Sequence, residues 1–150
     1  MLDLDYPFHS ALVDVARQPL HEELRGLAPS ESRIPFVSTV TGDLLAGKGL
    51  DASYWWRNVR SPVRFGDAIK RVADLGARVF VEISPRAIMH GYVAESLGEL
   101  LHQSALIASL GMSDEPEHDP VGATAARALA RGAQVDLERA FGRAPAEMRL

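Results

Sequence analysis

The sequence predicts an α/β fold in which parallel strands are flanked by helices. The main observation is a run of branched apolar residues at 79–83, because such runs form buried strands. Amphipathic helical patterns lie on both sides of it, at 65–75 and 88–101, and a second strand pattern follows at 105–110. Alternation of this kind indicates a parallel sheet covered by helices. The composition, 47% hydrophobic and 24% charged over 150 residues, fits one globular unit or a large part of one.

The first quarter of the chain predicts a strand, a helix and a second strand. Residues 2–6 alternate like a strand, and apolar residues then recur at helical spacing over 11–26. Pro19 is expected to kink or restart that helix and Gly26 to end it. The short apolar run at 34–40 predicts a buried strand.

Capping residues predict where the next helices begin and end. A glycine-rich loop leads to Asp51, the expected N-cap of a short helix through Tyr54 and Trp55. Gly76 is expected to end helix 65–75, and Pro85 to begin the helix after strand 79–83. Residues 111–120 read as an acidic loop and 121–132 as a weakly amphipathic helix. In the remaining segment, Leu137 and Phe141 are expected to dock on a neighbouring surface.

Composition excludes several functional classes. The chain has 16 basic and 20 acidic residues, dispersed and with a net charge of -4, so no basic stripe is available for nucleic acid. It has no cysteine, which rules out disulfides and fits a cytoplasmic protein. No apolar run approaches the ~20 residues that cross a bilayer. No metal-ligand spacing is present, and His21, His90, His102 and His118 read as surface or helix residues.

His9 is the candidate catalytic residue. It lies where the strand pattern 2–6 changes into the helix pattern that begins near Ser10, and such a switch can face a cleft. Imidazole groups titrate near neutral pH and can accept a proton from a hydroxyl or thiol. The alternative is a histidine that is only hydrogen-bonded at a loop edge.

Three motifs in order and register carry a resemblance to a known family. They are Tyr6-Pro7-Phe8-His9-Ser10, then Tyr54-Trp55-Trp56-Arg57-Asn58-Val59-Arg60-Ser61-Pro62-Val63-Arg64-Phe65, then Val79-Phe80-Val81-Glu82-Ile83-Ser84-Pro85. Together they resemble the C-terminal part of an acyltransferase domain of a modular type I polyketide synthase, similar to malonyl-CoA:acyl carrier protein transacylases. The resemblance covers roughly residues 1–110, with 111–150 similar to the helix and linker that follow such domains.

The resemblance implies an architecture and a chemistry. The chain would start at the last strand of a small ferredoxin-like subdomain and continue into an α/β-hydrolase-like large subdomain. A Ser-His dyad would move a malonyl-type group from coenzyme A to the phosphopantetheine of an acyl carrier protein, with no bound cofactor or metal. His9 matches the dyad histidine, and Asn58 matches the position whose backbone carbonyl steadies the imidazole. The expected setting is a cytoplasmic multifunctional enzyme of antibiotic or other secondary metabolism.

The nucleophile of this chemistry is absent from the sequence. No Gly-x-Ser-x-Gly elbow occurs in the 150 residues, and Ser10 is better placed as a helix cap than as a substitute. We therefore expect part of a domain that is inactive alone and works with its missing N-terminal half, neighbouring synthase domains and a carrier protein. Two alternatives stay open: a noncatalytic docking fragment of a synthase, and a serine hydrolase relative.

Acyl selectivity is predicted from the residues before His9. The resemblance places Tyr6, Pro7 and Phe8 at the acyl pocket, and the bulk of Phe8 favours malonyl over α-methyl donors. Tyr6 matches the methylmalonyl pattern, and Pro7 departs from both patterns. Methylmalonyl and an unusual starter group therefore remain alternatives, as does simple core packing of Tyr6 and Phe8.

Two further groups of residues have competing interpretations. Tyr54, Trp55 and Trp56 form either a binding platform or core packing, of which core packing is favoured. Arg57, Arg60 and Arg64 form a cationic cluster that could meet coenzyme A phosphates or an acidic carrier protein, or simply pair with carboxylates. Ser84-Pro85-Arg86 departs from the Ser-Pro-His usual in the family.

Overall fold

The computed structural model describes residues 7–108, 119–134, 136, 138 and 139. The chain divides into two compact units, Met1–Leu75 and Gly76–Leu150. The predicted strand at 2–6, most of the acidic loop and the docking residues Leu137 and Phe141 lie outside the described residues. Within the described part of the chain, no helix is long and apolar enough to span a membrane.

The first unit begins with two consecutive short helices where one was predicted. A 3₁₀ helix, η1, covers Ala11–Ala16, and the α-helix α1 covers Arg17–Glu23. Pro19 lies in the first turn of α1, where a missing amide hydrogen breaks no helical bond, so the α-helix restarts just before it. The chain leaves the helix at Glu23, three residues before the predicted stop at Gly26. Ser10 caps η1 as predicted, its Oγ accepting from the Leu12 amide at 3.3 Å.

The predicted strand at 34–40 is shorter than expected and is not part of a parallel sheet. Its only strand residues are β1, Val37–Ser38, which pair antiparallel with β2, Asp43–Leu44. The Gly42 amide donates to the Ser38 carbonyl at 2.7 Å, and Gly42 has a φ of 74°, which glycine adopts without strain. This tight turn brings the chain straight back, so β1 is half of a hairpin.

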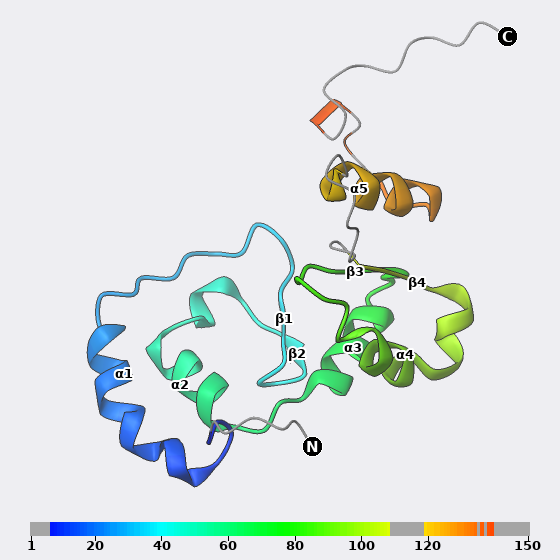
Figure 1. Ribbon diagram of the computed structural model, residues 1–150. Coiled ribbons are helices and arrows are strands. Elements are labelled where there is room, and N and C mark those ends of the chain that lie inside the picture. Colours follow the sequence, from blue (N-terminus) through cyan, green and yellow to red (C-terminus); the bar gives the residue numbers. More distant parts are fainter. Residues whose placement is uncertain (1–6, 109–118, 135, 137, 140–150) are drawn as a thin grey trace, which may run out of the picture. The chain divides into compact units, whose positions relative to one another are not determined.

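Two α-helices complete the first unit and carry its core. After the 3₁₀ turn η2, Gly47–Gly49, α2 covers Ala52–Arg60 and α3 covers Phe65–Asp74. Asp51 caps α2 as predicted, with its Oδ1 2.8 Å from the Tyr54 amide. The helix α2 packs beside α1, and α3 packs on both hairpin strands (Figure 1). Among residues 7–75 of this unit, the buried ones are Val13, Ser38, Gly47, Tyr54, Trp56, Ala68 and Ala73.

The second unit contains the predicted parallel strands. Strand β3, Val79–Glu82, pairs in parallel with β4, Ala105–Ala108. The connection between the two strands contains the α-helix α4, His90–Leu97, and the 3₁₀ helix η3, Gly98–Gln103. Gly76 ends α3 with the chain turning at a φ of 95°, as predicted. The prediction that Pro85 begins the next helix is wrong, because α4 begins at His90. That helix ends at Leu97, where Gly98 takes a φ of 53°.

The last described helix packs on the parallel strands. Helix α5, Pro120–Ala130, is capped by Asp119, whose Oδ1 lies 3.0 Å from the Val121 amide, and it contacts β4. In the described part of this unit, the buried core residues are Val93, Leu97, Ala105, Ile107 and Ala128. The second unit is therefore an α/β structure with parallel strands and flanking helices, as predicted.

Candidate functional site

The backbone of His9 is held in an uncommon conformation at the end of α2. His9 has a φ of 61°, the one positive value among the non-glycine residues that the structure describes. Such a conformation is disfavoured for a side chain with a Cβ and persists only where surrounding contacts fix it. One of these contacts is the His9 amide, which donates to the Val59 carbonyl at 2.9 Å.

A second contact orients the imidazole ring. Nδ1 of His9 lies 2.7 Å from the carbonyl oxygen of Ser61. Because a carbonyl only accepts, Nδ1 must carry the hydrogen, and Nε2 is then the nitrogen with a free lone pair. The ring itself is exposed. His9 is thus an oriented imidazole whose basic nitrogen can take a proton from a group brought to it.

The carbonyl that holds the ring belongs to Ser61 and not to Asn58, so the predicted role of Asn58 is wrong in this geometry. The reason is Pro62. A residue before proline is driven out of the helical region, and Ser61 is accordingly extended, with φ -82° and ψ 157°. The Ser61 carbonyl therefore does not point along the helix axis, as helical carbonyls do, and can accept a hydrogen bond from His9. The Ser-Pro pair after the helix was the sequence signal for this acceptor, and it was missed.

The segment that carries His9 is tied to its own helix and to α2. The Ser10 hydroxyl donates to the Pro7 carbonyl at 2.7 Å and caps η1, so it is not placed as a nucleophile. Asp14 on η1 forms an ion pair with Arg60 on α2, with Oδ1 and Nε 2.6 Å apart. Both contacts fix the entry and exit of the turn at His9.

The residues predicted to select the acyl group are only partly described. Pro7 and Phe8 precede His9 and are exposed, with Phe8 54% accessible. Tyr6 lies outside the described residues. The described pair thus directly precedes His9 in the chain and is exposed like it.

Of the three neighbouring aromatic residues on α2, two are buried and one is exposed. Tyr54 and Trp56 are core residues, so these two do not form a platform. Trp55 is 39% exposed and lines an apolar groove of about 290 Å³. The groove is completed by Leu20, Leu24, Leu27 and Val59.

Two of the three clustered arginines are paired with carboxylates. Arg60 is held by Asp14, and Arg64 lies 2.9 Å from Asp67. Arg57 is exposed, and no acceptor for it is found among the described residues. The described residues also contain no group of three or more His, Asp or Glu side chains that could hold a metal ion.

The fold and the site define an α/β protein that presents an oriented, exposed imidazole base, and comparisons with known proteins identify the family. A family model described as "Acyl transferase domain" matches residues 1–136. The chain is 38% identical over 120 residues to mycoketide-CoA synthase of Mycobacterium tuberculosis, which covers 78% of this chain and 3% of that protein. It is 36% identical over 139 residues to polyketide synthase GfsB of Streptomyces halstedii, covering 92% of this chain and 2% of that protein.

Solved structures give the same result. The acyltransferase domain from module 8 of the salinomycin polyketide synthase matches with a TM-score of 0.81 and 34% identity, over 91% of this chain and 32% of that chain. The domain from the second module of the same synthase matches with a TM-score of 0.76 and 30% identity, over 94% and 32%. This chain therefore belongs to the acyl transferase domain family and is an acyltransferase domain sequence of the polyketide synthase type. It spans about a third of the solved domains that it matches and a few percent of the curated synthases.

Proposed function

We propose that this chain supplies the general base of an acyltransferase that moves a malonyl-type group from coenzyme A to the phosphopantetheine thiol of an acyl carrier protein. The observation that carries the proposal is the 2.7 Å contact between His9 Nδ1 and the Ser61 carbonyl, which leaves Nε2 free as a base. Family membership supports the reaction class. The cytoplasm remains the predicted location.

In the first half of the reaction, Nε2 of His9 takes the proton of a serine hydroxyl. The serine oxygen then attacks the thioester carbonyl, the bond between that carbon and the coenzyme A sulfur breaks, and the departing thiolate receives the proton. In the second half, Nε2 takes the proton of the phosphopantetheine thiol, whose sulfur attacks the acyl-serine ester. The bond between the acyl carbon and the serine oxygen breaks, and that oxygen regains the proton. Because the sequence contains no Gly-x-Ser-x-Gly elbow, the serine must come from outside these 150 residues.

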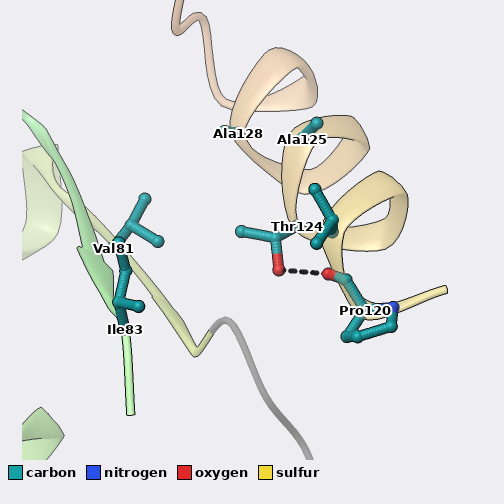
Figure 2. Close-up of a pocket in the computed structure, with 7 residues that line it drawn as sticks. Val81, Ile83, Pro120, Thr124, Ala125 and Ala128 are labelled. Carbon is teal, nitrogen blue, oxygen red and sulfur yellow. Dashed lines mark hydrogen bonds between the residues drawn. The ribbon is translucent and has the colours of Figure 1, made fainter. Parts of the chain in front are cut away.

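The rest of an acyltransferase domain is the partner that this proposal requires, and the second unit has a surface suited to it. An apolar groove of about 380 Å³ lies between β3 and α5. Val81 and Ile83 form one wall and α5 forms the other, where Thr124 Oγ1 donates to the Pro120 carbonyl at 2.7 Å (Figure 2). Ile83, directly after β3, is 86% exposed and Val81 is 40% exposed, so this wall of the groove is largely uncovered apolar surface.

The geometry of β3 supports the same partner. The Arg78 carbonyl accepts from the Ala105 amide at 2.7 Å, so backbone groups of alternate residues, beginning with Val79, are directed to the edge away from β4. Among the described residues no strand pairs with this edge, and such an edge beside an apolar groove suits a further strand of the domain. The two thirds of each matched solved domain that this chain does not span contain the material for it.

For acyl selectivity, we propose malonyl as the donor, because Phe8 directly precedes His9 in the chain and a bulky ring there would leave little room for an α-methyl group. Discrimination of one methyl group by packing reaches about 10–200-fold. Methylmalonyl is the runner-up.

Reconstitution tests the proposed function. The chain is mixed with the N-terminal part of the salinomycin module 8 acyltransferase domain, a carrier protein and labelled malonyl- or methylmalonyl-CoA. We expect labelled carrier protein, with malonyl preferred. Free acid as the main product would instead identify a serine hydrolase, and binding of the N-terminal part without turnover would identify a docking fragment. Chain or N-terminal part alone serves as the control and should label nothing.

A further inference from the structure

The carboxylate of Glu82 is the most heavily hydrogen-bonded side chain of the second unit's described residues. Its side chain is 11% exposed and lies at the last residue of β3. The Ser84 hydroxyl donates to it at 2.8 Å, the Ile88 amide at 2.9 Å and the Met89 amide at 3.1 Å to each oxygen. Nδ1 of His90 lies 3.0 Å from its second oxygen.

These donors place Glu82 at the entrance of α4. The N-cap residue of α4, Met89, has no side-chain capping bond of its own. Helix entrances leave amide hydrogens without helical partners, and a negative charge there is favourable. Glu82 supplies both the acceptor and the charge from the end of another element. It therefore fixes both ends of the loop 83–89.

The cluster contains a serine, a histidine and a glutamate but is not a catalytic triad. In a triad the serine hydroxyl meets the imidazole. Here the Ser84 hydroxyl meets the Glu82 carboxylate and lies 2.5 Å from the Arg86 carbonyl. The carboxylate accepts from Nδ1 of His90, so Nε2 of that ring is left as the acceptor nitrogen. The arrangement holds a loop in place and activates no nucleophile.

We propose that Glu82 is a charge-dependent latch: its carboxylate holds the loop 83–89 against α4 and accepts the Nδ1 hydrogen of His90, and loss of that charge releases the loop and weakens the bond to His90. The loop carries the exposed residues Ile83 and Ile88 at the carboxyl end of the parallel strands. Ligands of such sheets bind at this end. The charge on Glu82 therefore controls the position of this loop, and with it the exposed residues at that end of the sheet.

Few charged side chains near Glu82 contact its carboxylate, so its negative charge is stabilised mainly by hydrogen bonds. On neighbouring elements the titratable or charged side chains are Arg86, His90, Tyr92, Glu95 and Arg127. Of these, only His90 donates to the carboxylate within the part of the chain that the structure describes. Arg127 instead lies 3.4 Å from the carbonyl of Ala108, the register partner of Glu82.

The direction of the pH dependence follows from the environment of Glu82. Desolvation raises its pKa, but the bonds from Ser84, the Met89 amide, His90 and the Ile88 amide together outweigh this and hold the pKa below the ordinary value of 4.5. A lowered carboxyl pKa gives stabilisation that is complete above the unfolded-state value and is lost as the pH falls through the folded-state value. The latch is therefore closed at neutral pH and opens only in acid, below 4.5.

Amide exchange in the full chain tests the latch. We expect Glu82→Gln to speed backbone amide exchange at Ile88 and Met89 by about tenfold at neutral pH. The glutamine side chain lacks the negative charge of Glu82 and has one acceptor oxygen fewer. Nitrogen chemical shifts should show that His90 loses its preference for the Nδ1-protonated form. Glu95→Gln, an exposed position on α4, is the matched control and should change neither. Fluorescence of Trp55 and Trp56, both in the first unit, should stay the same.

Ser84→Ala provides an independent readout, because it keeps the charge and removes one bond that lowers the pKa of Glu82. The loop 83–89 should open at a higher pH in this variant than in the wild type. If Glu82→Gln unfolds the second unit, this difference in the pH of opening is the test of the latch. The latch is refuted if Glu82→Gln exchanges within about twofold of the wild type. It is equally refuted if Ser84→Ala leaves the pH of opening unchanged.

Discussion

Replacing His9 with asparagine should lower carrier-protein loading in the reconstituted acyltransferase by about 10²–10⁴-fold, the usual contribution of a general base. Asparagine is the informative choice for two reasons. It tolerates a positive φ better than most residues, and His9 sits at 61°. Its side-chain amide can also donate a hydrogen bond to the Ser61 carbonyl, which holds Nδ1 in the wild type. The variant thus keeps the anchor and removes the base.

The matched control is His102→Ala, an exposed histidine in η3 of the second unit, which should load the carrier protein at the wild-type rate. Both variants should bind the N-terminal part of the domain equally well. If His9→Asn retains loading within a few-fold of the wild type, then His9 is not the base.

Replacing Trp56 with alanine should destabilise the first unit by about 3–5 kcal/mol, the usual cost of emptying a large aromatic site in a core. Trp56 is 8% exposed, and the Arg17 guanidinium stacks over its ring at 5.9 Å from the centroid. The helix that carries Trp56 also supplies the Val59 carbonyl, and Ser61 follows directly after it. Loss of this packing should therefore also release His9.

Trp55→Ala gives a symmetrical control for this experiment, because the neighbouring ring is 39% exposed and leaves a smaller cavity. The chain has two tryptophans, so each variant retains one reporter in the first unit. Urea unfolding followed by fluorescence measures both free energies of unfolding. Equal losses from the two variants would show that Trp56 is not a core anchor of this unit.

The features that could be predicted from the sequence are those that depend on local patterns. The apolar runs at 79–83 and 105–110 gave β3 and β4, and their separation by a helix gave the parallel pairing. Asp51 and Ser10 were recognised as caps because an N-cap side chain acts on amides two or three residues away. His9 was found from the strand-to-helix switch and from family motifs.

The features that were missed depend on contacts between distant residues or on the competition of two local signals. The acceptor for His9 was assigned to Asn58, whereas Pro62 extends Ser61 and makes its carbonyl available, 52 residues along the chain from His9. The run at 34–40 contained a strand signal, but the turn ending at Gly42 folded it into a hairpin. Glu82 gave no signal because its partners are mainly backbone amides at the entrance of α4.

The most direct test of His9 as the base is the position of the ring hydrogen of its neutral imidazole in the intact chain, read from imidazole nitrogen chemical shifts. We expect the hydrogen on Nδ1, bonded to the Ser61 carbonyl, and a bare Nε2 that can accept a proton. A ring protonated mainly on Nε2 would contradict it, because the nitrogen proposed to act as the base would already hold a hydrogen.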